Sequence, residues 1–276
     1  MILVADDIRI TRKTIQIALD VKDPAPIQAM ATAAIARGAK ALDINAGPLT
    51  RNPEAQMAFL VEAVSSVTDL PLFIDTTNPA AMAAGLAQGP NPKVINGISL
   101  EPVKLKQILP LALEYGVPVV GFLLDEKSRV GRDSADRLEM AAALGSLCAE
   151  AGIPLGQIIF DPVVPPLAWE EGLYRAREVV KTLGLLPQLF GEPVKSLLGL
   201  SNLTTGGPDL YRREVMESAY VSMLAGAGLS HVLMDTGHGR SVEAVRAAAL
   251  LSGGDIFSWA SVGENRGKTL MDKRSG

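Results

Sequence analysis

The sequence predicts a (β/α)8 barrel, also called a TIM barrel, and three observations lead to this prediction. Eight short β-rich runs follow one another along the chain, a helical stretch follows each run, and 276 residues is a length at which such barrels fold as one domain. Strict alternation implies parallel strands joined by right-handed crossovers, and eight units close a barrel. An open, doubly wound sheet is the alternative.

The expected strands are short apolar runs bounded by turn residues. They cover residues 2–6, 41–46, 71–76, 94–99, 118–124, 158–163, 196–202 and 231–236. Pro26 and Pro53 each open an expected helix, and Asn78 caps a third helix that begins with Pro79. No linker or change of composition marks a boundary, so we expect residues 1–276 to form a single domain whose last ten residues are a polar tail.

Composition narrows the possible partners. A net charge of -4 gives no basic surplus to hold a nucleic-acid backbone, and we expect no nucleic-acid partner. No uncharged apolar run approaches the roughly 18 residues that cross a bilayer, and the first residues lack the features of a signal peptide. The single cysteine, Cys148, lies in an apolar helical segment and is expected to be a buried hydrophobe. These features are typical of a cytoplasmic protein without a membrane span.

The ends of the expected strands carry the candidate functional residues. In such a barrel, the chemistry lies at the carboxyl ends of the strands. Each strand ends there in an acid or an amide: Asp6 and Asp7; Asp43 and Asn45; Asp75; Asn96; Asp125; Asp161; Asn202; and Asp235. Either ligand binding or helix capping can explain each of them. Such a rim offers hydrogen-bond acceptors and little nucleophilic power.

Other chemistries find less support in the sequence. His231 and His238 are the only histidines, and no spacing typical of zinc is present, so we expect no metal site, with a carboxylate site for magnesium as the alternative. Glycines in the loops after strands seven and eight allow a phosphate-binding barrel as a further hypothesis. No nucleophile elbow typical of hydrolases occurs. The polar loops 125–133 and 204–209 are candidate lids.

The motifs at the strand ends resemble those of a known family. They are Ala41-Leu42-Asp43-Ile44-Asn45-Ala46-Gly47-Pro48, Phe73-Ile74-Asp75-Thr76-Thr77-Asn78, Val94-Ile95-Asn96-Gly97, Phe160-Asp161-Pro162 and Leu198-Gly199-Leu200-Ser201-Asn202. In this order they resemble the pterin-binding methyltransferases, above all methyltetrahydrofolate:corrinoid/iron-sulfur protein methyltransferase. The resemblance runs from about Asp23 to beyond Asp235.

This resemblance implies a barrel that holds tetrahydrofolate or 5-methyltetrahydrofolate as substrate in its mouth. Asp75 and Asp161 match the two carboxylates that bind the pterin, and Asn96 matches the amide beside them. Asn202 matches the asparagine near N5 and is the candidate catalytic residue, a positioned hydrogen-bond partner for protonated N5. Further possible site residues are Asp6, Asp7, Asp43, Asn45, Arg213 and Asp235.

The resemblance also implies partners. The chain lacks the Asp-x-His-x-x-Gly pattern that presents a histidine to cobalt, so the corrinoid (cobalamin) is expected on a separate protein, and family members pair as homodimers. Strand one departs from the family pattern: it reads Ala5-Asp6-Asp7-Ile8-Arg9 where the family has Gly-Glu-Arg-Ile-Asn. Thr205 stands where the family has glutamine.

Two alternatives remain within the pterin-binding fold. One is dihydropteroate synthase, although the expected seventh strand carries no lysine. The other is a non-catalytic pterin-binding subunit of a methyl-transfer complex, which the altered first strand suggests.

Overall fold

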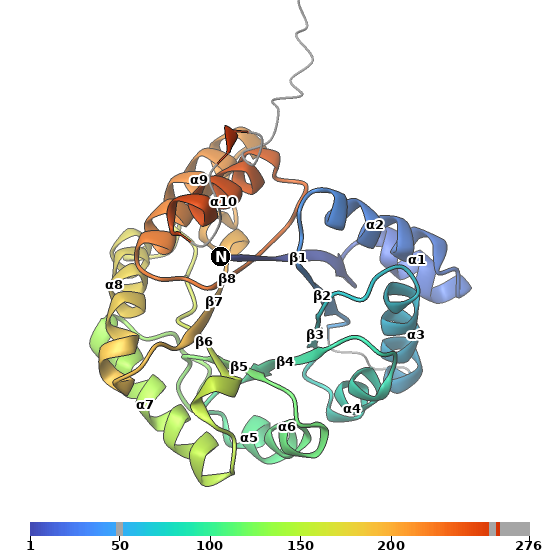
Figure 1. Ribbon diagram of the computed structural model, residues 1–276, viewed down its shortest axis with the longest axis horizontal. Helices are drawn as coiled ribbons and strands as arrows, with labels where there is room; N and C mark the ends of the chain where they lie inside the picture. Colours follow the sequence, from blue (N-terminus) through green and yellow to red (C-terminus); the bar gives the residue numbers. More distant parts are fainter. Residues whose placement is uncertain (48–51, 254–257, 260–276) are drawn as a thin grey trace, which may run out of the picture.

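The computed structural model describes residues 1–47, 52–253 and 258–259. In this part of the chain, eight parallel strands pair in sequence order and β8 pairs with β1, so the sheet closes into a barrel (Figure 1). This confirms the predicted fold class. The strands are β1 (Ile2–Arg9), β2 (Ala41–Asn45), β3 (Leu72–Asp75), β4 (Lys93–Ile98), β5 (Val119–Phe122), β6 (Ile158–Asp161), β7 (Lys195–Gly199) and β8 (His231–Met234).

The helices form a ring outside the barrel (Figure 1). They are α1 (Lys13–Val21), α2 (Ala25–Ala36), α3 (Pro53–Ser65), α4 (Pro79–Ala87), α5 (Pro102–Gln107), α6 (Leu109–Tyr115), α7 (Ser134–Glu150), α8 (Gly172–Phe190), α9 (Leu210–Gly226) and α10 (Gly239–Leu251), with short 3-10 helices η1 (Leu155–Gln157) and η2 (Leu200–Thr204). The expected helix starts are confirmed: Pro26 and Pro53 lie in the first turns of α2 and α3, and the Asn78 side chain caps α4.

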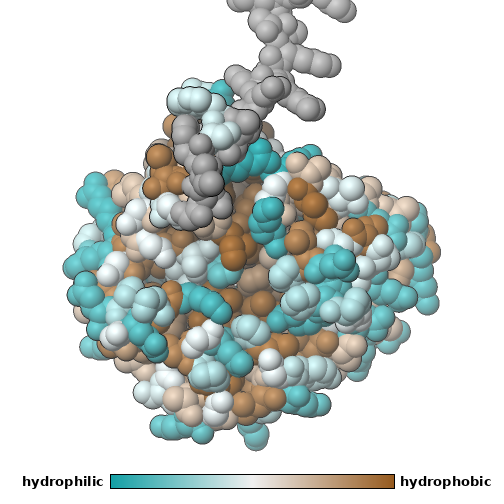
Figure 2. All heavy atoms as spheres, viewed as in Figure 1, coloured by the Kyte–Doolittle hydropathy of each residue, from teal (hydrophilic) through white to brown (hydrophobic). Residues whose placement is uncertain are grey.

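Two cores stabilise this arrangement. The larger one lies between strands and helices and includes Cys148, whose side chain is fully buried as expected. A smaller one fills the barrel and takes one side chain from each of seven strands: Val4, Ala41, Phe73, Val94, Val120, Ile159 and Leu197. On the outer surface, hydrophilic residues are spread around the margin of the face and hydrophobic residues show between them (Figure 2).

Several expected boundaries are wrong. β1 extends to Arg9 with a register irregularity between Ala5 and Ile8, so the expected end at residue 6 falls inside the strand. Two helices, and not one, follow both β1 and β4. β7 begins with Lys195, so a lysine does stand on this strand, but at the amino end, where it donates to the carbonyl of Gly156.

The expected polar tail, residues 267–276, lies outside the described residues. No helix in the described part of the chain is long and apolar enough to span a membrane.

Candidate active site

A polar layer lies directly above the apolar filling of the barrel. Side chains two positions apart on a strand share a face, so the residues two places beyond the inner core also point into the barrel, at the carboxyl ends of the strands. On β1 to β7 they are Asp6, Asp43, Asp75, Asn96, Phe122, Asp161 and Gly199. Acids and amides from well-separated parts of the sequence therefore converge on one mouth.

Asp161 is the most enclosed acid of the expected pterin contacts. Its side chain is buried at the tip of β6, and Oδ1 accepts a hydrogen bond of 2.8 Å from the backbone N–H of Val163. Burial raises the pKa of Asp161 from 3.8 to about 7, and that hydrogen bond opposes the rise. The ionised carboxylate of Asp161 therefore lacks the hydrogen bonds that water would donate to it in solution.

Arg137 holds the turn that follows Asp161 from behind. This arginine of α7 is fully buried, and it donates from Nε to the carbonyl oxygen of Pro162 (2.9 Å) and from Nη1 to that of Asp133 (3.1 Å). Val163, the next residue, has a φ of 52°, which is unfavourable for a β-branched side chain. The surrounding packing and the hydrogen bonds from Arg137 thus hold this turn in a conformation that Val163 would not favour by itself.

Asp75 lies on β3 with Asn45 beside it. The Asn45 amide donates to Asp75 Oδ2 over 2.6 Å. Burial raises the pKa of Asp75 to about 7, the charge of Asp6 adds to the rise, and the Lys104 ammonium opposes it. The structure thus brings Asn45 and Asp75 together, whereas Lys104, from α5, was not predicted because it follows a strand end by several residues.

Asp43 and Asn96 form a buried pair on β2 and β4. Asn96 Nδ2 donates to Asp43 Oδ1 over 2.9 Å, and Asp43 is fully buried. Burial, with the nearby charges of Asp75 and Asp6, raises the pKa of Asp43 well above its usual range. Asp43 Oδ2 and Asn96 Oδ1 have no partner although both atoms are buried. Buried polar atoms without a partner are unusual. A ligand N–H would satisfy Asn96 Oδ1, whereas Asp43 Oδ2 would accept a ligand N–H when ionised or donate to a ligand acceptor when protonated.

Asp6 and Asp235, on the β1 side of the mouth, form ion pairs with arginines of the same chain. Arg9 bridges them, with Nη1 at 3.0 Å from Asp6 and Nη2 at 2.9 Å from Asp235, and Arg12 makes a second contact with Asp235. Burial raises the pKa of Asp6 to about 6, and Arg9 opposes the rise. Arg9 of the altered first strand and Arg12, which follows that strand, therefore supply cations that pair with acids of the mouth.

Asp7 does not stand at a strand end, contrary to expectation. It lies inside β1, and its Oδ2 accepts the backbone N–H of Thr236 at 3.1 Å, which ties β1 to the loop after β8. Burial raises the pKa of Asp7. Asp7 was a possible ligand contact, but its carboxylate accepts a hydrogen bond from the protein backbone.

Asn202 lies in η2 and not at the end of β7, which stops at Gly199. Its side chain folds back over that glycine, because a Cβ added at Gly199 would stand 3.2 Å from Asn202 Nδ2. Gly199 is the β7 position of the polar layer, and its missing side chain leaves room for the amide. Asn202 thus joins the layer from a turn, and its own surface remains exposed.

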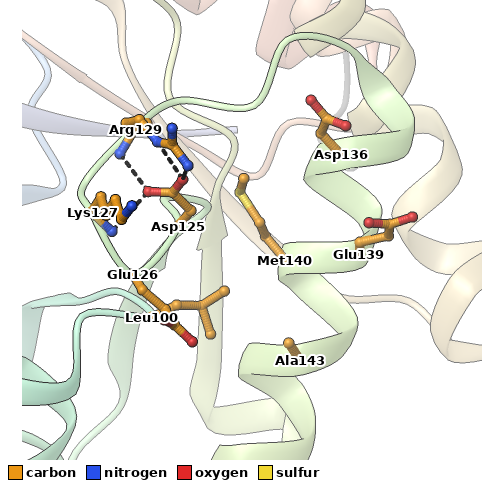
Figure 3. A pocket seen from close by; sticks show the side chains of 9 residues that line it. All are labelled: Leu100, Asp125, Glu126, Lys127, Arg129, Asp136, Glu139, Met140 and Ala143. Atoms are coloured by element: carbon orange, nitrogen blue, oxygen red, sulfur yellow. Dashed lines mark hydrogen bonds and ion pairs between the residues drawn. The ribbon is translucent and has the colours of Figure 1, made fainter.

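Asp125 and Arg213 form hydrogen bonds with residues outside the polar layer. Asp125 stands beyond the end of β5 and accepts hydrogen bonds from the N–H groups of Lys127 and Arg129 and from the Arg129 side chain (Figure 3). These bonds lower the pKa of Asp125 to about 2, Arg129 first. Arg213 Nε donates to Thr204 Oγ1 over 3.4 Å. Asp125 is therefore a loop-forming residue; the groove beside it is lined by Asp136, Glu139 and Met140 of α7 (Figure 3).

A second polar cluster lies beside the mouth and was not predicted. Glu217 of α9 is buried and bonded to Thr204, Ser241 and His238. Glu217 stands four residues before Val221, on the buried face of α9, where an apolar side chain is expected. A charged residue on that face is the one signal in the sequence that could have identified the cluster. In the described part of the chain, no group of three His, Cys, Asp or Glu side chains is arranged to hold a metal ion.

The chain is similar in sequence to two kinds of methyl-transfer protein. Methylcorrinoid:tetrahydrofolate methyltransferase of Eubacterium limosum is 22% identical over 259 residues, which cover 92% of each chain. Methionine synthase of Mycobacterium tuberculosis is 25% identical over 205 residues, 71% of this chain. That match spans only 17% of the methionine synthase. The chain therefore corresponds to a small part of that longer relative and to nearly all of the shorter one.

The fold has close counterparts among solved structures. A Yersinia pestis dihydropteroate synthase with a sulfonamide drug complex superimposes with a TM-score of 0.68 at 16% identity, covering 91% of this chain and 93% of that one. At this identity the likeness concerns the fold alone. The model of the family described as "Pterin binding enzyme" matches residues 15–235, which include Asp43, Asp75, Asn96, Asp161 and Asn202. The chain therefore belongs to the pterin binding enzyme family.

Proposed function

We propose that the protein transfers a methyl group between N5 of tetrahydrofolate and the cobalt of a corrinoid carried by a separate protein, in either direction, including formation of methyltetrahydrofolate in a demethylase system. The observation that carries the proposal is the polar layer, in which Asp75, Asn96 and Asp161 line the mouth and Asn202 folds over Gly199 beside them. The Eubacterium limosum relative, similar along nearly its whole length, supports the choice of reaction.

The polar layer suits the edge of a reduced pterin. That edge presents an exocyclic amine and ring N–H groups, and a carboxylate can accept two hydrogen bonds from them. In the proposal, Asp161 and Asp75 accept such bonds. Asn96 uses one N–H on Asp43 and keeps its unpartnered Oδ1 for the ligand. Pterin binding would thus satisfy acceptors that the protein alone leaves without partners.

Asn202 acts at the reacting end of the ring. Breaking the bond between N5 and the methyl group requires positive charge at N5, so the transition state is stabilised by a group that accepts a hydrogen bond from protonated N5. An amide is too weak an acid to supply the proton, and we assign to Asn202 the positioning of that proton, with water and carboxylates completing its path. The partner's cobalt supplies the methyl acceptor or donor.

Two further parts of the proposal concern assembly. The chain's own side chains offer no histidine in the pattern that presents an imidazole to cobalt, so the corrinoid is proposed on a protein that docks over the mouth. A homodimer formed through the barrel helices is the proposed oligomeric state.

A non-catalytic pterin-binding subunit is the second candidate. It is favoured by the β1 side of the mouth, where Arg9 and Arg12 occupy the acids Asp6 and Asp235. Such a subunit would hold the pterin without methyl transfer. Dihydropteroate synthase is supported less, because the one lysine of β7, Lys195, lies at the end of the strand away from the mouth.

Calorimetric titration with tetrahydrofolate tests the binding part of the proposal. Saturable binding is expected, and absence of binding at millimolar ligand would refute it. The chemistry is tested by mixing the protein with methyltetrahydrofolate and free cobalamin reduced to the cob(I) state, and following the absorbance of the cobalamin. Methyl exchange supports the transferase, whereas binding without exchange, both with free cobalamin and with candidate corrinoid proteins, supports the non-catalytic subunit.

A further inference from the structure

Glu217 is a buried carboxylate that the proposed chemistry does not use. It lies on α9 with 1% of its surface exposed. Its Oε1 accepts a hydrogen bond from Thr204 Oγ1 at 2.5 Å, and its Oε2 accepts one from Ser241 Oγ at 2.9 Å. The ring nitrogen Nδ1 of His238 lies 2.7 Å from the same Oε2. Both oxygens of this acid are therefore engaged, and all three partners are buried side chains.

The partners of Glu217 belong to the two loops that complete the mouth. Thr204 is the last residue of η2, the turn that carries Asn202. His238 is the N-cap of α10, and its backbone N–H donates to the carbonyl oxygen of Asp235 over 3.2 Å. One carboxylate thus joins the loop after β7 to the loop after β8, from a helix that packs behind both.

The contacts of Glu217 are those of an ionised carboxylate. Burial by itself raises the pKa of Glu217, but the hydrogen bonds from His238 and Thr204 outweigh it, and the net pKa is lowered. The pKa of His238 is raised, first because of its hydrogen bond to Glu217. A charged acceptor holds its donors more strongly than a neutral one, which fixes the geometry of both loops.

Asn202 depends on that geometry more than the other polar-layer residues do. Asp75, Asn96 and Asp161 stand on strands, whose positions the barrel fixes. Asn202 stands on a single 3-10 turn, and within the described residues its side chain neither donates nor accepts a hydrogen bond. Where its amide points therefore depends on the backbone of η2 and on packing against Gly199, and no hydrogen bond to its side chain helps to hold it.

We propose that Glu217 is a positioning residue that fixes the η2 turn, and through it the Asn202 amide, against the loop after β8. The expected effect on kcat rests on the proposed function, whereas the fixing of the η2 turn by Glu217 does not depend on that function. Glu217 touches neither the polar layer nor a ligand, so its effect is expected on the reaction step and not on ground-state pterin binding.

Glu217→Gln is the test variant, because the amide keeps the size of the side chain but replaces one acceptor with an N–H group that faces donors. Methyl transfer from methyltetrahydrofolate to free cob(I)alamin should show kcat reduced roughly ten- to a hundredfold, as expected for a catalytic group displaced by a remote change, with the Kd for tetrahydrofolate nearly unchanged. Hydrogen exchange of the ligand-free variant should be faster at the amides of residues 201–207.

Glu214→Gln is the matched control. Glu214 lies one turn earlier on the same helix and accepts the backbone N–H of Arg240, without contact to Thr204. This control should keep both parental kcat and parental exchange at residues 201–207. If Glu217→Gln does not fold, Thr204→Val removes the hydrogen bond from η2 to Glu217, together with the longer one of 3.4 Å that Arg213 donates to the same hydroxyl, and should give the same kinetic and exchange pattern.

Parental kcat and parental exchange in both Glu217→Gln and Thr204→Val would overturn the inference, and so would a loss confined to tetrahydrofolate affinity. The failure of the proposed function is seen separately. If the parent protein binds no tetrahydrofolate, the exchange comparison still decides whether Glu217 fixes the turn.

Discussion

The pKa of Asp161 predicts how pterin binding depends on pH. In the ligand-free site, burial holds this pKa at about 7, and the rise from 3.8 corresponds to about 4 kcal/mol disfavouring the ionised form. A pterin that donates hydrogen bonds to Asp161 binds the ionised form. Tetrahydrofolate affinity should therefore be constant above about pH 8 and should fall, by up to about tenfold per pH unit, below about pH 7. Asp75 adds a similar dependence, because its pKa is also about 7.

The variant Asp161→Asn distinguishes the contribution of Asp161 to the pH dependence of affinity from that of Asp75. The amide keeps the size of the side chain and can still accept the N–H of Val163, but it has no charge to gain. Because hydrogen bonds to a charged group contribute roughly 1.5–3 kcal/mol, affinity at pH 8 should fall by roughly ten- to a hundredfold. The slope of affinity against pH should decrease by one proton, leaving the part that Asp75 contributes.

Calorimetry in two buffers of different ionisation enthalpy measures both quantities, because the difference in heat gives the protons released on binding. The parent should release protons near pH 7 and the variant should release fewer. Glu126→Gln, a change of an exposed acid in the loop after β5, serves as control and should match the parent. An affinity of the parent that is the same at about pH 6 and about pH 8, with no proton release, would refute the reasoning.

Two other predictions concern Asn202 and Arg137. Asn202→Ala should reduce kcat for methyl transfer more than it weakens tetrahydrofolate binding; a pure binding defect in single-turnover kinetics would contradict its assigned role. Arg137→Ala should lower the free energy of unfolding by roughly 3 kcal/mol, since it leaves a cavity and removes the donors to the carbonyl groups of Pro162 and Asp133. Urea denaturation measures this, with the exposed Arg177→Ala as control; equal stabilities would show that the buried guanidinium contributes nothing.

The strand pattern was predictable because each strand is a short apolar run that an acid or an amide ends or closely follows. Asp75, Asn96 and Asp161 stand at or near the ends of their strands, and their convergence follows from parallel strands closing into a barrel. The sequence also indicated which residues cap helices, as at Asn78. Local chemistry was sufficient for these features.

Features that depend on pairing across the chain could not be predicted. Arg9 contacts Asp235 across 226 positions of sequence, and nothing near either residue indicates the pairing. α1 follows Arg12, whose side chain makes no capping hydrogen bond, so the usual signal of a helix start was missing. Asn202 was placed on a strand because Leu197 to Leu200 is apolar, whereas the chain turns after Gly199 into η2.

The polar layer also bears on how this protein could be stabilised. As pH rises from 3.8 toward 7, the unfolded chain loses its Asp161 proton before the folded one does, so this residue makes the ligand-free fold less stable in that range. Asp161→Asn should relieve that effect above pH 7, and selection for thermal stability without ligand would favour such replacements at the buried acids Asp43, Asp75 and Asp161. Stability and ligand recognition thus make opposite demands on the same few positions, and engineering for heat resistance should begin on the helix ring.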